Sequence, residues 1–193
     1  RKISIEEAYA AALRAGVDKF LAEPVAQGWD ALARKNAPHK GEAGGAAGGI
    51  VYAGDYFCSV EAASRSGLPR LLREALAANG IQKTVCDDRL IRNNPIDIAE
   101  RFDELLKDRK VSALVISSGS YDAFNPKYPE FPAAYKTLAD KARAAQIPLI
   151  LLTQRAAKMG REKSLNEAIR PLDNPPAVRV LDAAKIFADE LAR

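Results

Sequence analysis

Apolar positions along the chain alternate between short continuous runs and longer stretches with helical spacing. The short runs predict strands at 50–53, 82–86, 111–116, 149–152 and 177–181. The longer stretches predict helices around 67–79, 96–106, 134–142, 165–169 and 186–191. Five strand–helix steps favour an α/β fold: a doubly wound, flavodoxin-like sheet of five parallel strands flanked by helices. The third run is nearly all apolar, so we expect it at the centre of the sheet.

The segment before the first strand predicts a separate helical extension. Residues 1–35 carry apolar side chains at helical spacing on both sides of Pro24. Residues 36–48 are rich in Gly and Ala without periodicity, which is typical of a linker. The α/β domain is therefore expected at 49–193. Trp29 either anchors a partner protein through these helices or packs them onto the domain.

Charge and composition narrow the class of partner. The 193 residues carry a net charge of +4, with Lys and Arg spread among acids, so nucleic-acid binding is not expected. No apolar run is long enough to span a bilayer. The sequence starts with Arg1 instead of Met, which favours a trimmed product. This is compatible with a periplasmic or secreted protein, and a cytoplasmic one is the alternative.

Polar residues gather where the predicted strands end, at the sheet edge where ligands of such folds bind. The lone histidine, His39, precedes the first strand, so a Ser-His-Asp triad and a His-rich metal site are both excluded. The Gly-rich stretch also precedes that strand instead of following it, so no dinucleotide cofactor is expected. The edge segments are rich in carboxylates and hydroxyls and lack His and Lys; they are 55–59, 87–88, 117–122, 153–154 and residue 182.

Three short motifs together give a family resemblance. Gly54-Asp55-Tyr56 follows the first strand, Gly119-Ser120-Tyr121-Asp122 follows the third, and the run 165–170 leads to Asp182. In this order and spacing, residues 49–193 resemble the SGNH (GDSL-like) hydrolase superfamily, whose first motif reads Gly-Asp-Ser and whose third reads Gly-x-Asn-Asp. The resemblance implies an esterase-like fold. It carries over Gly54, Asp55, Gly119 and Asp122.

The departures from this family fall on its reactive positions. Tyr56 stands where the nucleophilic serine is expected, and Tyr121 stands where the oxyanion-hole asparagine is expected. The family's Asp-x-x-His motif has no counterpart up to Arg193. A phenol is bulkier than a serine hydroxyl and has no histidine here to take its proton. The two tyrosines either flank a pocket for a flat ligand or fill the ancestral cleft.

Two neighbouring loops carry side chains suited to a ligand. Residues 121–132 are rich in aromatic rings, which line a pocket, bind a partner or pack together to stiffen the loop. The basic segment 155–163 either attracts an acidic ligand or is a solvated loop.

The two cysteines follow the first two predicted strands, which are neighbours in a flavodoxin-like order. A disulfide between Cys58 and Cys86 is therefore reasonable, and two buried thiols are the alternative. A bridge would favour an exported protein.

The leading hypothesis is a catalytically degenerate SGNH-hydrolase-like domain that acts as a binding or accessory protein for a carbohydrate or an acylated ligand. The alternatives are an esterase or acyltransferase with rearranged residues, or with a histidine beyond residue 193, and a protein-interaction module. Catalytic candidates, if any catalysis remains, are Asp55, Ser59 and Asp122. The predicted ligand-binding residues are Asp55, Tyr56, Ser118, Gly119, Tyr121, Asp122, Thr153 and Gln154.

Overall fold

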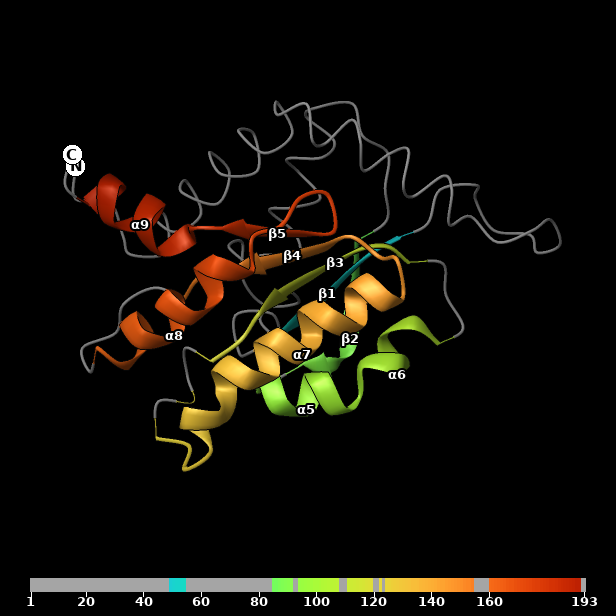
Figure 1. Ribbon diagram of the computed structural model, residues 1–193, viewed down its shortest axis with the longest axis horizontal. Helices are drawn as coiled ribbons and strands as arrows, with labels where there is room; N and C mark the ends of the chain where they lie inside the picture. Colours follow the sequence, from blue (N-terminus) through green and yellow to red (C-terminus); the bar gives the residue numbers. More distant parts are fainter. Residues whose placement is uncertain are drawn as a thin grey trace, which may run out of the picture.

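A single parallel sheet organises the domain. The computed structural model describes residues 49–54, 85–91, 94–107, 111–119, 122, 124–154 and 160–191. Within them, five strands pair in the order β2-β1-β3-β4-β5 (Figure 1). This is the flavodoxin-like order that the sequence predicts. The helical extension 1–35, the linker 36–48 and the helix expected at 67–79 lie outside the described residues.

Four strands lie where the apolar runs predict them, to within one residue at each end. They are β1 (Gly49–Gly54), β3 (Val111–Ser117), β4 (Leu149–Leu152) and β5 (Val178–Leu181). β3 is central and pairs with β1 and β4, and it is buried from Ser112 to Ser117. Continuous burial explains why its sequence is nearly uniformly apolar.

The predicted position of the second strand was wrong. β2 spans Val85–Ile91 instead of 82–86, because its register is set by pairing with β1, which starts with Ile50 opposite Val85. Asp87 and Asp88 therefore lie within the strand instead of beyond it, and Cys86 lies near its start instead of at its end. β2 lies at the edge of the described sheet, where charged residues are tolerated and discourage pairing with other chains.

The single helix predicted at 96–106 is two short helices, α5 (Pro95–Glu100) and α6 (Phe102–Leu106). Asn94 caps α5 by accepting hydrogen bonds from the backbone N–H groups of Ile96 and Asp97 at 2.9 and 3.1 Å. Arg101 leaves the helical conformation between the two helices. The break lets Phe102 stay buried together with the core residues of α5.

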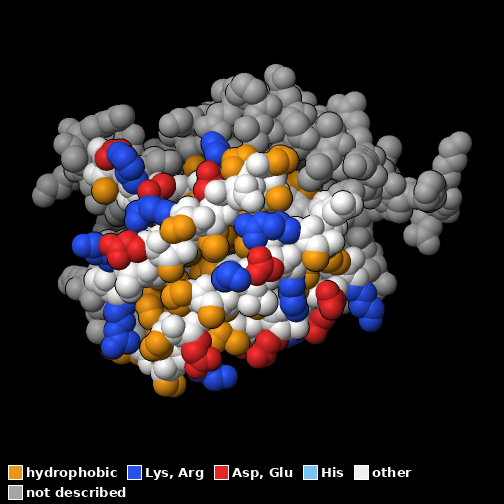
Figure 2. All heavy atoms as spheres, in the orientation of Figure 1, with side chains coloured by type: hydrophobic (Ala, Val, Ile, Leu, Met, Phe, Trp, Pro, Cys, Tyr) orange, Lys and Arg blue, Asp and Glu red, His pale blue; other side chains and the backbone are white. Residues whose placement is uncertain are grey.

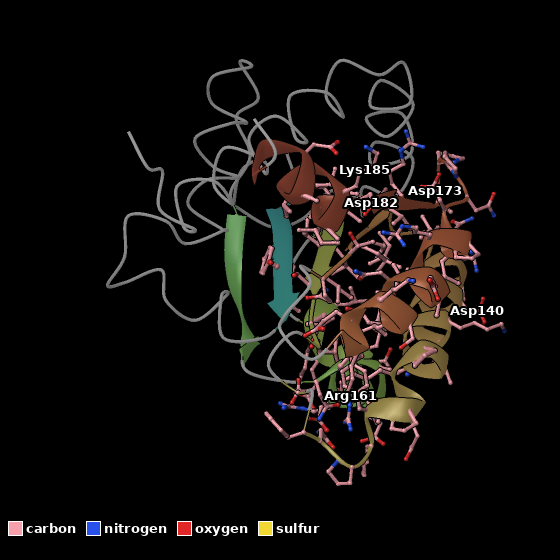
Figure 3. All side chains as sticks on the ribbon, turned by 90° about the vertical axis from the view of Figure 1, so that its left-hand side faces the viewer. Asp140, Arg161, Asp173, Asp182 and Lys185 are labelled. Carbon is pink, nitrogen blue, oxygen red and sulfur yellow. The ribbon has the colours of Figure 1, made fainter. Side chains whose placement is uncertain are left out.

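The described helices between strands cover one face of the sheet. Figures 1 and 3 show α5, α7 and α8 side by side on that face, and α7 contacts both of its neighbours. α7 (Phe131–Ala144) buries its apolar side in the core, and a short 3₁₀ turn, η1 (Tyr128–Glu130), precedes it. The remaining elements are α8 (Arg161–Ile169), η2 (Arg170–Leu172) and α9 (Ala183–Leu191). Within the described part, no helix has both the length and the apolar character needed to cross a bilayer.

Asp182, which follows β5, links β4, η2 and α9 by hydrogen bonds. It directly precedes α9 and accepts a hydrogen bond from the backbone N–H of Lys185 at 3.2 Å. The hydroxyl of Thr153, just after β4, donates to Asp182 at 2.8 Å, and Arg170 of η2 donates to both of its carboxylate oxygens at 2.8 and 3.2 Å. Burial acts to raise the pKa of Asp182, but these hydrogen bonds outweigh it and hold the pKa below its ordinary value.

We expect Asp182→Ala to lower the free energy of unfolding by about 1–2 kcal/mol at neutral pH, because it removes a helix cap and a partly exposed ion pair. Since the folded-state pKa is lowered, the charge-dependent part of this stabilisation is present above the ordinary carboxyl pKa and is lost as the pH falls through the folded value. Urea unfolding at neutral pH and near pH ~3 measures both effects. Asp189→Ala, which removes the exposed partner of Lys185, is the control and should change stability little. A loss for Asp182→Ala that is no larger than the control's would contradict this role.

Candidate functional site

Of the predicted edge segments, residues 117–119, 153–154 and 182 lie where β3, β4 and β5 end, whereas 87–88 lie within β2 and 55–59 lie outside the described residues. Gly54 ends β1 opposite Ser117 of β3, and Thr153 follows β4 beside Leu181 of β5. Figure 3 looks onto this carboxyl edge, with Asp182 and Lys185 at its upper end and Arg161 at its lower end. The polar residues here come from strands far apart in sequence, as expected for a parallel sheet.

A buried tyrosine holds the chain where it leaves β3. The hydroxyl of Tyr135, on α7, donates to the carbonyl of Ser118 at 2.6 Å and accepts from the N–H of Ser118 at 3.1 Å. Both residues are 0% exposed. A single phenol therefore satisfies both backbone groups of the first residue after the strand, in a place where water does not reach them.

Gly119 continues this segment in a conformation that favours glycine. Its φ is +109°, and a Cβ placed there would lie 2.9 Å from Leu165 Cδ2 and 3.4 Å from Phe131 Cδ2. The chain thus turns directly beneath side chains of α7 and α8. The glycine that the resemblance carries over is required here by backbone angle and by space.

The chain after β4 is held by an amide pair. The backbone N–H of Gln154 donates to Asn166 Oδ1 at 2.7 Å, and Asn166 Nδ2 donates to the carbonyl of Gln154 at 2.6 Å. The Gln154 side chain donates to the carbonyl of Leu152 at 2.8 Å and, more weakly, to Tyr135 at 3.4 Å. Gln154 and Asn166 are buried, so these bonds link α8, β4 and α7 beneath the edge.

The carboxyl group of Asp122 has a raised pKa. It is half-buried, and its backbone carbonyl accepts from the N–H of Asn125 at 2.8 Å. Burial raises the pKa of Asp122, a hydrogen bond with the Asn125 side chain opposes this, and the Asp97 carboxylate raises it further. Carboxyl groups with raised pKa values are enriched at binding and catalytic sites.

A second carboxyl, Glu162, lies buried in the first turn of α8. Neither of its carboxylate oxygens has a hydrogen-bond partner among the described residues, and the same holds for the buried Tyr128 hydroxyl. Burial raises the pKa of Tyr128 to about 12, with the Glu162 carboxylate as the next cause. The charges of Glu162 and Asp122 therefore both act on the Tyr128 hydroxyl.

The described residues settle the position of only part of the predicted site. Ser118 and Gly119 shape the edge through their backbones. The side chains of Thr153 and Gln154 are buried and hydrogen-bonded internally, so their role as ligand contacts stays a prediction, as does that of Asp122. Outside the described residues lie Asp55, Tyr56, Cys58, Ser59 and Tyr121.

With Cys58 outside the described residues, the disulfide with Cys86 stays a prediction too. In the ranges that the structure describes, no three His, Cys, Asp or Glu residues gather closely enough to hold a metal ion.

The supporting roles of Tyr135 and Asn166 were not predicted from the sequence. Each lies on the buried side of a helix among apolar residues. This position on the apolar side of a helix could have indicated a structural role, because a buried polar side chain needs a hydrogen-bond partner. Which backbone group serves as the partner is decided only by how α7 and α8 pack.

Comparison with solved structures identifies the fold. A variant of the esterase AlinE4 superimposes with a TM-score of 0.60 at 16% identity, covering 78% of this chain and 82% of that one. AlinE4 itself is described as an SGNH-hydrolase family esterase and gives a TM-score of 0.55 at 19% identity, with 74% and 77% coverage. The psychrotrophic esterase EstA from Pseudoalteromonas sp. gives 0.53 at 15% identity, with 75% and 94% coverage.

The fold is similar to that of SGNH-hydrolase esterases. No protein-family model and no curated protein matches the chain. At these identities the likeness concerns the backbone alone, so it supports the fold implied by the three motifs and leaves the chemistry to the residues.

We expect Gly119→Ala to destabilise the domain by about 2–3 kcal/mol, because the new methyl group meets Leu165 and the backbone angle is strained. Gly160→Ala is the matched control. Its φ is +68°, but nothing lies within 4 Å of the position that its Cβ would take, so only backbone strain of about 1 kcal/mol applies. Chemical unfolding of both variants measures the difference, and equal losses would show that the contact with Leu165 is unimportant.

Asp122→Asn is expected to raise the stability slightly at neutral pH. A raised folded-state pKa means that the folded protein binds the proton more tightly, so stability falls as the pH rises from the ordinary carboxyl pKa through the folded one. Removing the charge abolishes this loss of stability. The gain in the free energy of unfolding should be less than about 1 kcal/mol, because the carboxyl group is half-exposed and screened by solvent. Thermal unfolding across pH checks the sign: the variant should exceed wild type near neutrality and converge with it in acid. A variant that is less stable at neutral pH would contradict the prediction.

Proposed function

We propose that this chain is a catalytically degenerate SGNH-hydrolase-like protein that binds a carbohydrate or an acylated ligand at the carboxyl edge of its sheet. The observation that carries this proposal is Tyr56, two residues beyond the end of β1, at the position where the resemblance places a nucleophilic serine. An exported setting fits a binding role of this kind.

The chemistry of the chain supports binding over hydrolysis. Ester hydrolysis by this family's route needs a hydroxyl nucleophile and a base that takes its proton. The chain offers a phenol at the first position, and its single histidine is His39, before β1. Neither residue type at these positions supplies an activated alkoxide.

The architecture beneath the edge supports a retained binding surface. The hydrogen bonds of Tyr135, Asn166 and Asp182 hold the ends of β3, β4 and β5 in place. A preorganised edge lowers the entropic cost of holding a ligand. It also leaves the backbone of Ser118 and Gly119 fixed just beyond Ser117, which pairs with Gly54 at the end of β1.

An esterase or acyltransferase with rearranged residues is the second candidate. Asp122 favours it, because a half-buried carboxyl with a raised pKa is suited to proton transfer. The similar solved structures include esterases, which agrees with this candidate at the level of the fold.

Ester turnover separates the two candidates. We expect the purified chain to hydrolyse p-nitrophenyl acetate and butyrate no faster than a buffer control. Enzymes accelerate their reactions by at least about 10⁶-fold, so even a poor active preparation is readily distinguished. Ser59→Ala and Asp122→Ala test the remaining candidate groups, and Asp140→Ala, on the exposed side of α7, is the matched control.

Turnover that is abolished by Ser59→Ala or Asp122→Ala, and kept by Asp140→Ala, would overturn the binding proposal and establish the second candidate. Turnover equal in all variants would point to a contaminating esterase and is checked by repeating the assay on protein from a second purification route.

A further inference from the structure

A groove of about 560 Å³ lies between the loop that precedes α7 and the first turn of α8. Phe124 and Pro129 line it from the loop, and Arg161 and Ser164 line it from the helix. Figure 2 shows hydrophobic side chains gathered over this loop, at the lower left of the view. Figure 3 shows Arg161 beside the same loop, at the lower end of the carboxyl edge. The volume falls in the range of about 300–1,000 Å³ that is common for small-molecule sites.

The loop presents one aromatic ring to solvent and anchors two others. Phe124 is 81% exposed, whereas Tyr128 is 6% exposed and Phe131 is fully buried. The rings of Tyr128 and Phe131 pack with centroids 4.9 Å apart, which fixes the base of the loop. Phe124 is thus exposed beside a groove that the buried Tyr128 also lines. An exposed aromatic ring in this position could stack on a flat ligand.

The charges around the groove are of both signs. The Arg161 guanidinium lies on its helical side, and the carboxylates of the buried Glu162 and of Asp122 act on Tyr128, which also lines the groove. At Tyr128 the two carboxylates act against Arg161. An ionised ligand of either sign would meet a like charge, so the field favours a neutral one.

The polar groups that line the groove suit hydroxyl groups. Ser164 donates its hydroxyl hydrogen to the carbonyl of Arg161 at 2.8 Å, so its oxygen is left as an acceptor toward a ligand. Arg161 contributes N–H donors. The Asn125 amide also lines the groove and keeps part of its hydrogen-bonding capacity for a ligand, since its oxygen accepts from the N–H of Lys127 at 2.9 Å and its side chain also bonds to Asp122. A sugar hydroxyl both donates and accepts, and a pyranose ring has an apolar face of C–H groups that packs on an aromatic ring.

We propose that this groove binds a neutral pyranose unit of a glycan, stacked on Phe124 and hydrogen-bonded by Asn125, Arg161 and Ser164. The inference deepens the proposed binding function and rests on it, since it names the carbohydrate class as the ligand. An acyl chain fits less well, because it would cover the Ser164 hydroxyl without hydrogen-bonding to it. Tyr56 is not among the residues that line the groove, so the two can be substituted separately.

Isothermal titration with cellohexaose, mannohexaose and maltohexaose tests the proposal. We expect at least one of these neutral oligosaccharides to bind, and Phe124→Ala to weaken that binding about tenfold or more. Phe124→Trp should retain it, because the platform is kept. Arg161→Gln should weaken it less, and Lys136→Ala, on the exposed side of α7, is the matched surface control. Phe124 is exposed, so thermal unfolding of its variants should match that of wild type.

Hexagalacturonate and decanoate are the charged and acylated comparisons. Tighter binding of either one than of all three neutral sugars would overturn the inference, as would the failure of all three to bind at millimolar concentration. Sugar binding that is unchanged in Phe124→Ala would also overturn it, while leaving the proposed binding function standing. Asp122-dependent ester turnover would instead overturn the proposed function and leave the groove result intact.

Discussion

The hydroxyl of Tyr135 holds the chain at the point where it leaves the central strand. Leaving one buried backbone group unpaired costs about 1–3 kcal/mol, and this phenol pairs both groups of Ser118. The bond also fixes the height of α7 over the sheet, because the ring has to reach the end of β3. Gly119 then turns the chain under Leu165, a packing that only a residue without a side chain allows.

The same construction recurs along the carboxyl edge. Asn166 of α8 pairs with the backbone after β4, and Arg170 with Thr153 holds Asp182 after β5. In each case a side chain from a neighbouring element supplies the hydrogen bonds that the strand end lacks. The described ends of β3, β4 and β5 are therefore each held by side chains of neighbouring elements, as preorganisation of a binding site would require.

The residues that support the strand ends differ from those that remain accessible at the surface. Thr153 and Gln154 face inward and serve the scaffold, whereas Asp122 and the rim of the groove keep the exposure and the electrostatic field that a ligand would meet. The fold is similar to that of SGNH-hydrolase esterases. The supporting bonds among the described residues hold the strand ends whether or not the edge carries a reactive group, so they are compatible with the degenerate protein that we propose.

The sequence alone predicted the order of the strands and the extents of four of them, since burial on both faces leaves a continuous apolar run in β3 and β4. It also identified Gly119 as a residue that follows β3 at the edge. Only the tertiary structure decided the register of β2, because pairing with β1 outweighs the local apolar pattern at an edge strand. Only the tertiary structure revealed the supporting roles of Tyr135 and Asn166 and the groove at Phe124. The hydrogen bonds join residues 12 or 17 positions apart, and the groove lies between a loop and a helix. Both depend on how the elements pack, which leaves no periodic pattern in the sequence.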